Sequence, residues 1–282
     1  MERLTEIVTG WKIPVGRTAK QGFDWLKAHA SPVFDVLAAA MEGLISGILW
    51  LLSAPHPFVV VAAAVALTWA LQRRLSTCLL VAAGFLFILN QGYWDETMQS
   101  LTLVLASCLV CMAAGVPLGI AAAHRPRLHA WMRPVLDLMQ TLPTFVYLIP
   151  AIVFFGIGMV PGLIATVIFV LPAPIRLTHL GIRSTPVALV EAGRAFGATP
   201  RQLLWKVELP SAMPQIMAGL NQTIMLSLSM VVIAALVGAS GLGVPVVRAL
   251  NSVNTALGFE SGVVIVVVAI LLDRMLRMER DR

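Results

Sequence analysis

Two cysteines of this 282-residue chain have a spacing that could support chemistry. Cys108 and Cys111 form a CxxC pattern, which occurs in redox and metal sites. No histidine or second cysteine pair lies near them, so we expect both to pack between helices as small, polarizable side chains. The GxxxxGK[S/T] loop that binds phosphates does not occur in the sequence. The histidines lie in loops or near the ends of apolar runs and form no paired catalytic constellation: His29, His56, His124, His129 and His179. We therefore predict no enzyme, no metal site and no cofactor on this chain.

The composition predicts an integral membrane protein. Hydrophobic residues make up 59% of the chain and charged residues only 12%, whereas soluble domains carry about 45–50% and about 25%. This balance excludes a soluble enzyme, a disordered chain and a fibrous protein. The net charge is +6, but Lys and Arg are not interleaved with aromatic residues, so we expect no nucleic-acid partner.

Apolar runs predict seven membrane-spanning helices, or eight if an ambiguous segment also crosses. A spanning helix needs about 20 apolar residues, with a range of about 17–25. The seven predicted spans are 55–72, 77–94, 101–123, 135–155, 160–175, 213–238 and 256–272. Frequent Gly and Pro within them indicate a tightly packed bundle, because breakers are tolerated where neighbouring helices satisfy the freed backbone groups.

The ambiguous segment is 34–52, which has the pattern of an amphipathic helix. Its apolar residues recur at helical spacing, while Asp35, Glu42 and Ser46 fall on the opposite side. Such a helix can lie flat in the membrane interface, or cross if its polar side faces protein. Both interpretations remain open from the sequence.

The distribution of basic residues predicts the orientation. Lys and Arg concentrate at 73–74, 125–133, 176–206 and 274–282, whereas the intervening loops are nearly free of them. Basic loops face the cytoplasm in most membrane proteins. The C-terminus is therefore expected to be cytoplasmic.

The longest hydrophilic stretch between spans is 176–212, and its residues predict a helix, a break and a second helix. Residues 187–196 are good helix formers, and Gly197 can adopt the left-handed conformation that ends a helix. Thr199 and Pro200 then give an N-cap followed by a proline in the first turn. Leu209 and Pro210 are expected to stop the second helix. Its apolar stripe could dock into a groove on another protein, or fold back on the membrane.

This loop resembles the EAA signature of ABC importer permeases. The match is Glu-Ala, four residues, Gly, nine residues, then a hydrophobic residue, x and Leu-Pro; Gly193 departs from the Ala common in the family. The matching residues are Glu191, Ala192, Gly197, Val207, Leu209 and Pro210. The wider sequence from about 98 to 272 is similar to permeases of the glycine betaine/proline/choline family, and most of all to the choline-type permease.

The resemblance implies an all-α, type I ABC importer transmembrane domain in the bacterial cytoplasmic (inner) membrane. It divides the chain into an N-terminal tail (1–33), N-terminal amphipathic and transmembrane helices (34–94), and a permease core (95–282) with a coupling loop at 185–210. The implied partners are a second copy of the permease, two ABC ATPase subunits that carry ATP and Mg²⁺, and an extracytoplasmic substrate-binding protein. The implied coupling residues are Glu191, Ala192, Gly197, Leu203, Leu204, Val207, Leu209 and Pro210, of which Leu203, Leu204 and Val207 would fill the groove of the ATPase.

The implied function is ATP-driven import of choline or a related quaternary ammonium compound. The alternatives are the same architecture importing glycine betaine, proline betaine or another osmolyte, or an ATP-independent channel or secondary transporter. The span interiors 139–175 and 213–238 contain no charged residue, which counts against a proton-coupled transporter.

A quaternary ammonium ion cannot lose its charge and is well held by aromatic faces. The candidate path residues are Gln140, Thr144, Phe145, Tyr147, Asn221 and Met225. The alternative is that these residues serve helix packing and interhelical hydrogen bonds. Asp137 is expected either to pair with Arg133 one helical turn away or to attract cations at the inner mouth.

Overall fold

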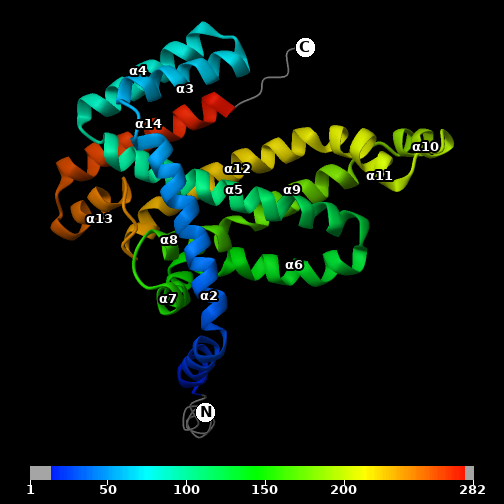
Figure 1. Cartoon of the computed structure of the whole chain (residues 1–282), viewed down its shortest axis with the longest axis horizontal. Helices are drawn as coiled ribbons and strands as arrows, with labels where there is room; N and C mark the ends of the chain where they lie inside the picture. The colour runs from blue at the N-terminus through cyan, green and yellow to red at the C-terminus, as the bar shows by residue number, and fades with distance from the viewer. Residues whose placement is uncertain (1–13, 277–282) are drawn as a thin grey trace, which may run out of the picture.

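The computed structural model describes residues 14–276, and this part of the chain is entirely helical. The helices in chain order are α2 (Val15–Ser53), α3 (Pro57–Gln72), α4 (Leu75–Gln91), α5 (Trp94–His124), α6 (Pro126–Thr141), α7 (Thr144–Phe155), α8 (Met159–Val170), α9 (Pro172–Arg183), α10 (Val187–Ala195), α11 (Pro200–Leu203), the π-helical turn η1 (Leu204–Glu208), α12 (Leu209–Ala235), α13 (Gly243–Ser252) and α14 (Thr255–Leu276). Figure 1 shows α5, α9 and α12 side by side at the centre, with α10 and α11 projecting at one end.

The central helices approach closely because small residues line their contacts. A Cβ atom on Gly119 of α5 would lie 2.7 Å from the Ile175 carbonyl oxygen of α9, and one on Gly115 would lie 2.8 Å from the Pro174 ring. The Ser107 hydroxyl of α5 and the Ser227 hydroxyl of α12 are hydrogen-bonded at 2.8 Å, and both are buried. Glycine and serine at helix contacts permit this distance and supply interhelical hydrogen bonds in apolar surroundings.

Fewer helices than expected are long and apolar enough to span a membrane. Among the described residues, five qualify: 16–53, 94–124, 159–183, 200–235 and 255–275. The bent pair α6–α7 adds a sixth, whereas α3 and α4, with 16 and 17 residues, are shorter apolar helices. The seven or eight predicted crossings therefore reduce to five or six candidates with two short helices beside them.

The predicted span 135–155 is wrong as a single helix. It breaks into α6 and α7, which meet at an angle of 98°. The break falls at Leu142, whose backbone is extended (φ −66°, ψ 137°), directly before Pro143. Proline disfavours helical geometry in the residue that precedes it, and this local effect outweighs the apolar composition of the run.

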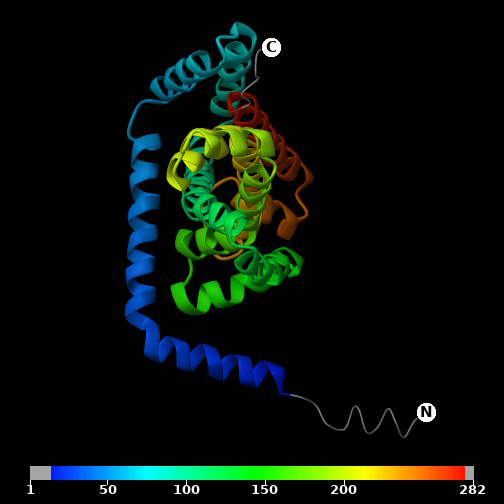
Figure 2. The same ribbon diagram turned by 90° about the vertical axis from the view of Figure 1, so that its right-hand side faces the viewer.

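Helix α2 begins well before residue 34, so the expected tail and the amphipathic segment form one helix in the described residues. It contains Pro32, and proline inside a helix bends it. Figure 2 views the central helices almost end-on, and α2 runs along their side, transverse to them, with a bend in its N-terminal third. Phe34 stacks on Phe154 of α7 at a ring-centroid distance of 4.4 Å. If α5 and α12 cross the membrane, this course places α2 along the membrane plane, so α2 is long and apolar enough to span but does not cross in this arrangement.

Candidate functional site

The α10–α11 segment has the helix–break–helix geometry that its residues predict. Gly197 has φ +76°. Its N–H donates to the Arg194 carbonyl at 2.9 Å, and the Ala198 N–H donates to the Gly193 carbonyl at 3.0 Å. These two bonds are the Schellman pattern, in which a left-handed residue satisfies the last carbonyls of a helix. The prediction that Gly197 ends the first helix is confirmed.

The second helix starts at the predicted cap. The Thr199 hydroxyl accepts from the Gln202 N–H, and the Gln202 side chain accepts from the Thr199 N–H at 2.9 Å, with Pro200 in the first turn. This reciprocal capping box satisfies two backbone donors at once. It fixes where α11 begins relative to Gly197.

Leu209 and Pro210 do not stop this helix, contrary to the prediction. The chain continues from α11 through η1 into α12, and the Leu209 N–H donates to the Leu204 carbonyl five residues earlier. Proline lacks the N–H that an α-helix needs at its position. In the π turn the hydrogen bond reaches five residues back, and this wider turn ends directly before Pro210. Pro210 then lies in the first turn of α12.

The coupling residues expected from the sequence differ in exposure. Leu203 is buried, and a Cβ on Gly193 of α10 would meet its Cδ1 at 2.8 Å, so Leu203 packs inside the segment rather than on its outer surface. Leu204, Val207 and Leu209 are half-buried, whereas Glu191, Ala192, Gly197 and Pro210 are exposed. The outward apolar side chains lie outside the expected coupling set: Phe196, at 92% exposure, and Val187, Leu189 and Trp205.

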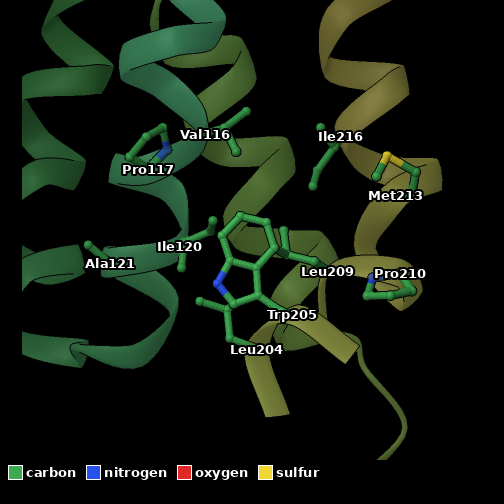
Figure 3. Close-up of a pocket in the computed structure, with 10 residues that line it drawn as sticks. All are labelled: Val116, Pro117, Ile120, Ala121, Leu204, Trp205, Leu209, Pro210, Met213 and Ile216. Carbon is green, nitrogen blue, oxygen red and sulfur yellow. The ribbon is translucent and has the colours of Figure 1, made fainter. Parts of the chain in front are cut away.

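An apolar groove of about 920 Å³ runs between α5 and the start of α12. Figure 3 shows Trp205 reaching from η1 toward Ile120 of α5, with Leu209 beside it. The remaining lining residues are Val116, Pro117, Ala121, Leu204, Pro210, Met213 and Ile216. The groove lies between two central helices that also contact each other, next to the α10–α11 segment.

A histidine–glutamate pair joins these helices at one end of the groove. Nε2 of His124, the last residue of α5, lies 2.8 Å from Oε2 of Glu208, the last residue of η1. Glu208 is buried, whereas the His124 side chain is 45% exposed. Sequence reasoning missed this pair because 84 residues separate its members.

The candidate path residue Gln140 and the acidic residue Asp137, both in α6, are tied to a single arginine of α9. Arg176 donates from Nη1 to the Gln140 Oε1 at 2.7 Å and from Nη2 to the Asp137 Oδ1 at 2.6 Å. The expectation that Asp137 pairs with Arg133 is therefore wrong. Asp137 pairs with Arg176 on another helix, whose guanidinium also reaches Gln140. The fork of Arg can hold two acceptors at once, and here it fastens α6 to α9.

Tyr147 has a structural partner at the α6–α7 break. Its hydroxyl donates to the Met139 carbonyl at 2.5 Å. In a continuous helix that carbonyl would accept from residue 143, but Pro143 has no N–H. Tyr147 is buried, whereas Phe145 is 58% exposed and Thr144 is half-buried.

The remaining path candidates lie on a different side of α12. The Asn221 Nδ2 is 3.4 Å from Oδ1 of Asp273 on α14. Met225 lines a separate groove with residues of α4 and α14, including Thr77 and Asp273, and with Arg74 directly before α4. The structure thus brings Gln140 and Tyr147 near the α6–α7 break but does not join them with Asn221 and Met225.

We expect Tyr147→Phe to loosen the α6–α7 break. Losing the hydroxyl leaves the Met139 carbonyl without its donor, which costs about 1 kcal/mol for a typical intramolecular hydrogen bond. Thermal unfolding in detergent should show a lower Tm, while Phe145→Leu, at an exposed position of the same helix, should leave the Tm near that of the unchanged protein. Equal Tm values for Tyr147→Phe and the unchanged protein would contradict this role.

Cys108 and Cys111 are both free and buried. Cys111 Sγ lies 3.8 Å from the Val167 carbonyl of α8. Within residues 14–276, no group of three or more His, Cys, Asp or Glu side chains is arranged to hold a metal ion. The cysteines pack between helices, in the manner that the sequence predicts.

The chain belongs to the family of binding-protein-dependent transport system inner membrane components, which matches residues 115–278. It is 45% identical over 264 residues to the glycine betaine transport system permease protein OpuAB of Bacillus subtilis (strain 168), covering 94% of this chain and 93% of that protein. It is 44% identical to the glycine betaine/proline betaine permease ProW of Escherichia coli (strain K12), over 93% of this chain and 74% of ProW. It is 46% identical to the glycine betaine/carnitine permease GbuB of Listeria monocytogenes serotype 1/2a (strain 10403S), over 86% of this chain and 87% of GbuB.

The fold is that of a type I ABC importer permease. A chain in an inward-facing structure of the MetNI methionine ABC transporter superimposes with a TM-score of 0.59 at 24% identity, covering 69% of this chain and 98% of that one. This similarity establishes the fold alone. Together with the family, it identifies the chain as a multi-pass inner-membrane permease subunit of a binding-protein-dependent ABC importer, which implies ATPase and substrate-binding partners.

Proposed function

We propose that this chain forms the membrane pathway of an ATP-driven importer for glycine betaine or proline betaine. The observation that carries the proposal is the 43–46% identity to four permeases named for glycine betaine transport, over most of this chain. These relatives favour the osmolyte alternative over choline, which the sequence analysis placed first. Both cargoes are quaternary ammonium ions, but glycine betaine also carries a carboxylate.

In the proposed complex, two copies of this chain face each other and two ATPase subunits bind ATP and Mg²⁺ in the cytoplasm. The α10–α11 segments contact the ATPases, and the C-terminus lies on the same side. A substrate-binding protein delivers the cargo from outside. ATP binding draws the ATPases together, and α10–α11 carries that movement to the central helices.

The test of cargo is uptake into proteoliposomes that contain this chain and its ATPase, with the binding protein added outside. We expect labelled glycine betaine or proline betaine to accumulate only when ATP is enclosed, and choline to accumulate more slowly. ATP-dependent uptake of choline alone would overturn the cargo. ATP-independent uptake would overturn the proposed mechanism and favour a channel or secondary transporter.

We expect Phe196→Ala to weaken the ATPase contact. The Phe196 ring is 92% exposed directly before the Gly197 turn, and exposed aromatic side chains commonly anchor protein interfaces. The amount of ATPase that co-purifies should fall, while membrane insertion should not change. Phe259→Ala is the matched control, because Phe259 is 76% exposed at the start of α14, distant in Figure 1 from α10. An unchanged yield of ATPase with Phe196→Ala would place the contact elsewhere on the segment.

A further inference from the structure

The contact between His124 and Glu208 requires one more proton than a neutral histidine and a carboxylate contain. Nδ1 of His124 lies 2.9 Å from the Ile120 carbonyl oxygen, which can only accept a hydrogen bond. Nδ1 must therefore carry a proton. Nε2 lies 2.8 Å from a carboxylate oxygen of Glu208. A neutral imidazole has a single N–H, so the second contact needs a further proton between Nε2 and Oε2, carried either by an imidazolium facing a carboxylate or by a carboxylic acid that donates to the imidazole.

The position of this pair gives it mechanical importance. Glu208 ends the π turn that connects the α10–α11 segment to α12, and His124 ends α5. Between the same two helices the apolar groove leaves a gap beside Ile120 and Leu209. The pair therefore adds a polar link between α5 and η1 beside the apolar contacts that the two elements already share.

The surroundings make an unpaired Glu208 costly. Ala123, Ile182, Ala212 and Ile216 form a buried apolar cluster next to the pair, with Leu204 and Leu209 packed on it. A carboxylate that loses its partner in such surroundings is strongly destabilising. When the proton leaves, the pair must separate or Glu208 must turn toward water.

We propose that His124 and Glu208 form a proton-dependent clasp that makes α5 follow the α10–α11 segment when the ATPase moves it. The clasp is a positioning device, because neither residue need touch the cargo. This inference rests on the proposed function, in which the segment receives the movement of the ATPase. It predicts that the ratio of cargo imported to ATP hydrolysed depends on cytoplasmic pH.

The Lys and Arg side chains on the neighbouring elements stay charged over the same pH range, whereas two histidines there can also titrate. Arg125 and Arg127 lie at the start of α6, Arg183 ends α9 and Lys206 is in η1; side chains of these types stay cationic around neutral pH. His129 of α6 and His179 of α9 stack on each other at 4.0 Å. They are the other histidines on the elements packed here, so His129→Gln is the control for a histidine outside the clasp.

The experiment measures the import-to-hydrolysis ratio in proteoliposomes at about pH 6.5 and about pH 8.5, across the range where histidine changes charge. The import-to-hydrolysis ratio of the unchanged protein should be at least about threefold lower at the higher pH, and the ratio of His129→Gln should fall by the same factor. His124→Gln should have the low ratio at both values. His124→Lys keeps a cation opposite Glu208 and should have the high ratio at both. A His124→Lys protein as poorly coupled as His124→Gln, or a ratio of the unchanged protein that does not vary with pH, would overturn the clasp.

A second measurement separates failure of the clasp from failure of the proposed function. If no betaine or choline is imported by the unchanged protein, the proposed function fails. The clasp is then tested by a double-mutant cycle of His124→Gln and Glu208→Gln on thermal unfolding in detergent. A stabilising interaction at about pH 6.5 that disappears at about pH 8.5 supports the clasp, and an interaction that is zero or equal at both values overturns it.

Discussion

Replacing Gly197 with valine should lower ATP-driven uptake by more than about tenfold while leaving the amount of protein in the membrane unchanged. Gly197 has φ +76°, a conformation that costs a residue with a Cβ about 1–2 kcal/mol and is worst for β-branched side chains. No atom lies within 4 Å of the place where a Cβ would stand. The strain therefore falls on the turn between α10 and α11 and not on the packing of the bundle.

The control for this prediction is Gly197→Asn, because asparagine tolerates the left-handed region far better than valine. We expect it to keep most of the uptake. Uptake and ATP hydrolysis should be measured together, since a distorted turn should leave hydrolysis poorly linked to import. Full transport by Gly197→Val would show that the turn is not needed, and loss of the protein from membranes would show a role in folding instead.

The second large effect is expected at Gly119, where α5 and α9 are closest. A Cβ there would stand 2.7 Å from a backbone oxygen and 2.6 Å from the Thr178 Cβ, neither of which can move without shifting α9. Overpacking of this kind costs about 1–3 kcal/mol. Gly119→Ala should lower the Tm of the detergent-solubilised protein by roughly 5 °C, and Gly119→Val should lower it further.

Gly43→Ala supplies the comparison, because it also lies inside a helix but has open space around its Cβ position. Its Tm should stay level or rise, since alanine restricts the unfolded chain more than glycine does. If Gly119→Ala unfolds at the same temperature as Gly43→Ala, the close approach of α5 and α9 does not contribute to stability.

The features that the sequence predicts correctly depend on neighbours in the chain. The Gly197 turn and the Thr199 cap are specified within a few residues, so their geometry follows from local rules. The same local rules give a wrong prediction at Pro210, which is expected to stop the second helix but lies in the first turn of α12, a position that proline also favours. Only the π turn before it decides that the helix continues.

The features that the sequence does not predict join distant residues. Asp137 has Arg133 one helical turn away, but its partner is Arg176, 39 residues along the chain. Glu208 occupies the position x between the hydrophobic residue Val207 and Leu209 in the EAA pattern, where any residue is allowed, so the pattern predicts no role for it. Likewise, the transverse course of α2 depends on its packing against α5, α7 and α8, which hydropathy does not encode.

Because α11, η1 and α12 follow one another without a break, a small rotation at one end of this helix gives a large displacement at the other. The helix from Pro200 to Ala235 has 36 residues, which at about 1.5 Å per residue gives a length of about 54 Å, or slightly less because Pro214 bends α12. Tilting a helix of this length by about 10° about one end displaces the other by about 9 Å. That is more than twice the contact distance of about 3.5–4.0 Å between carbon atoms, so a modest rotation of one end becomes a displacement large enough to open or close a gate at the opposite face of the membrane.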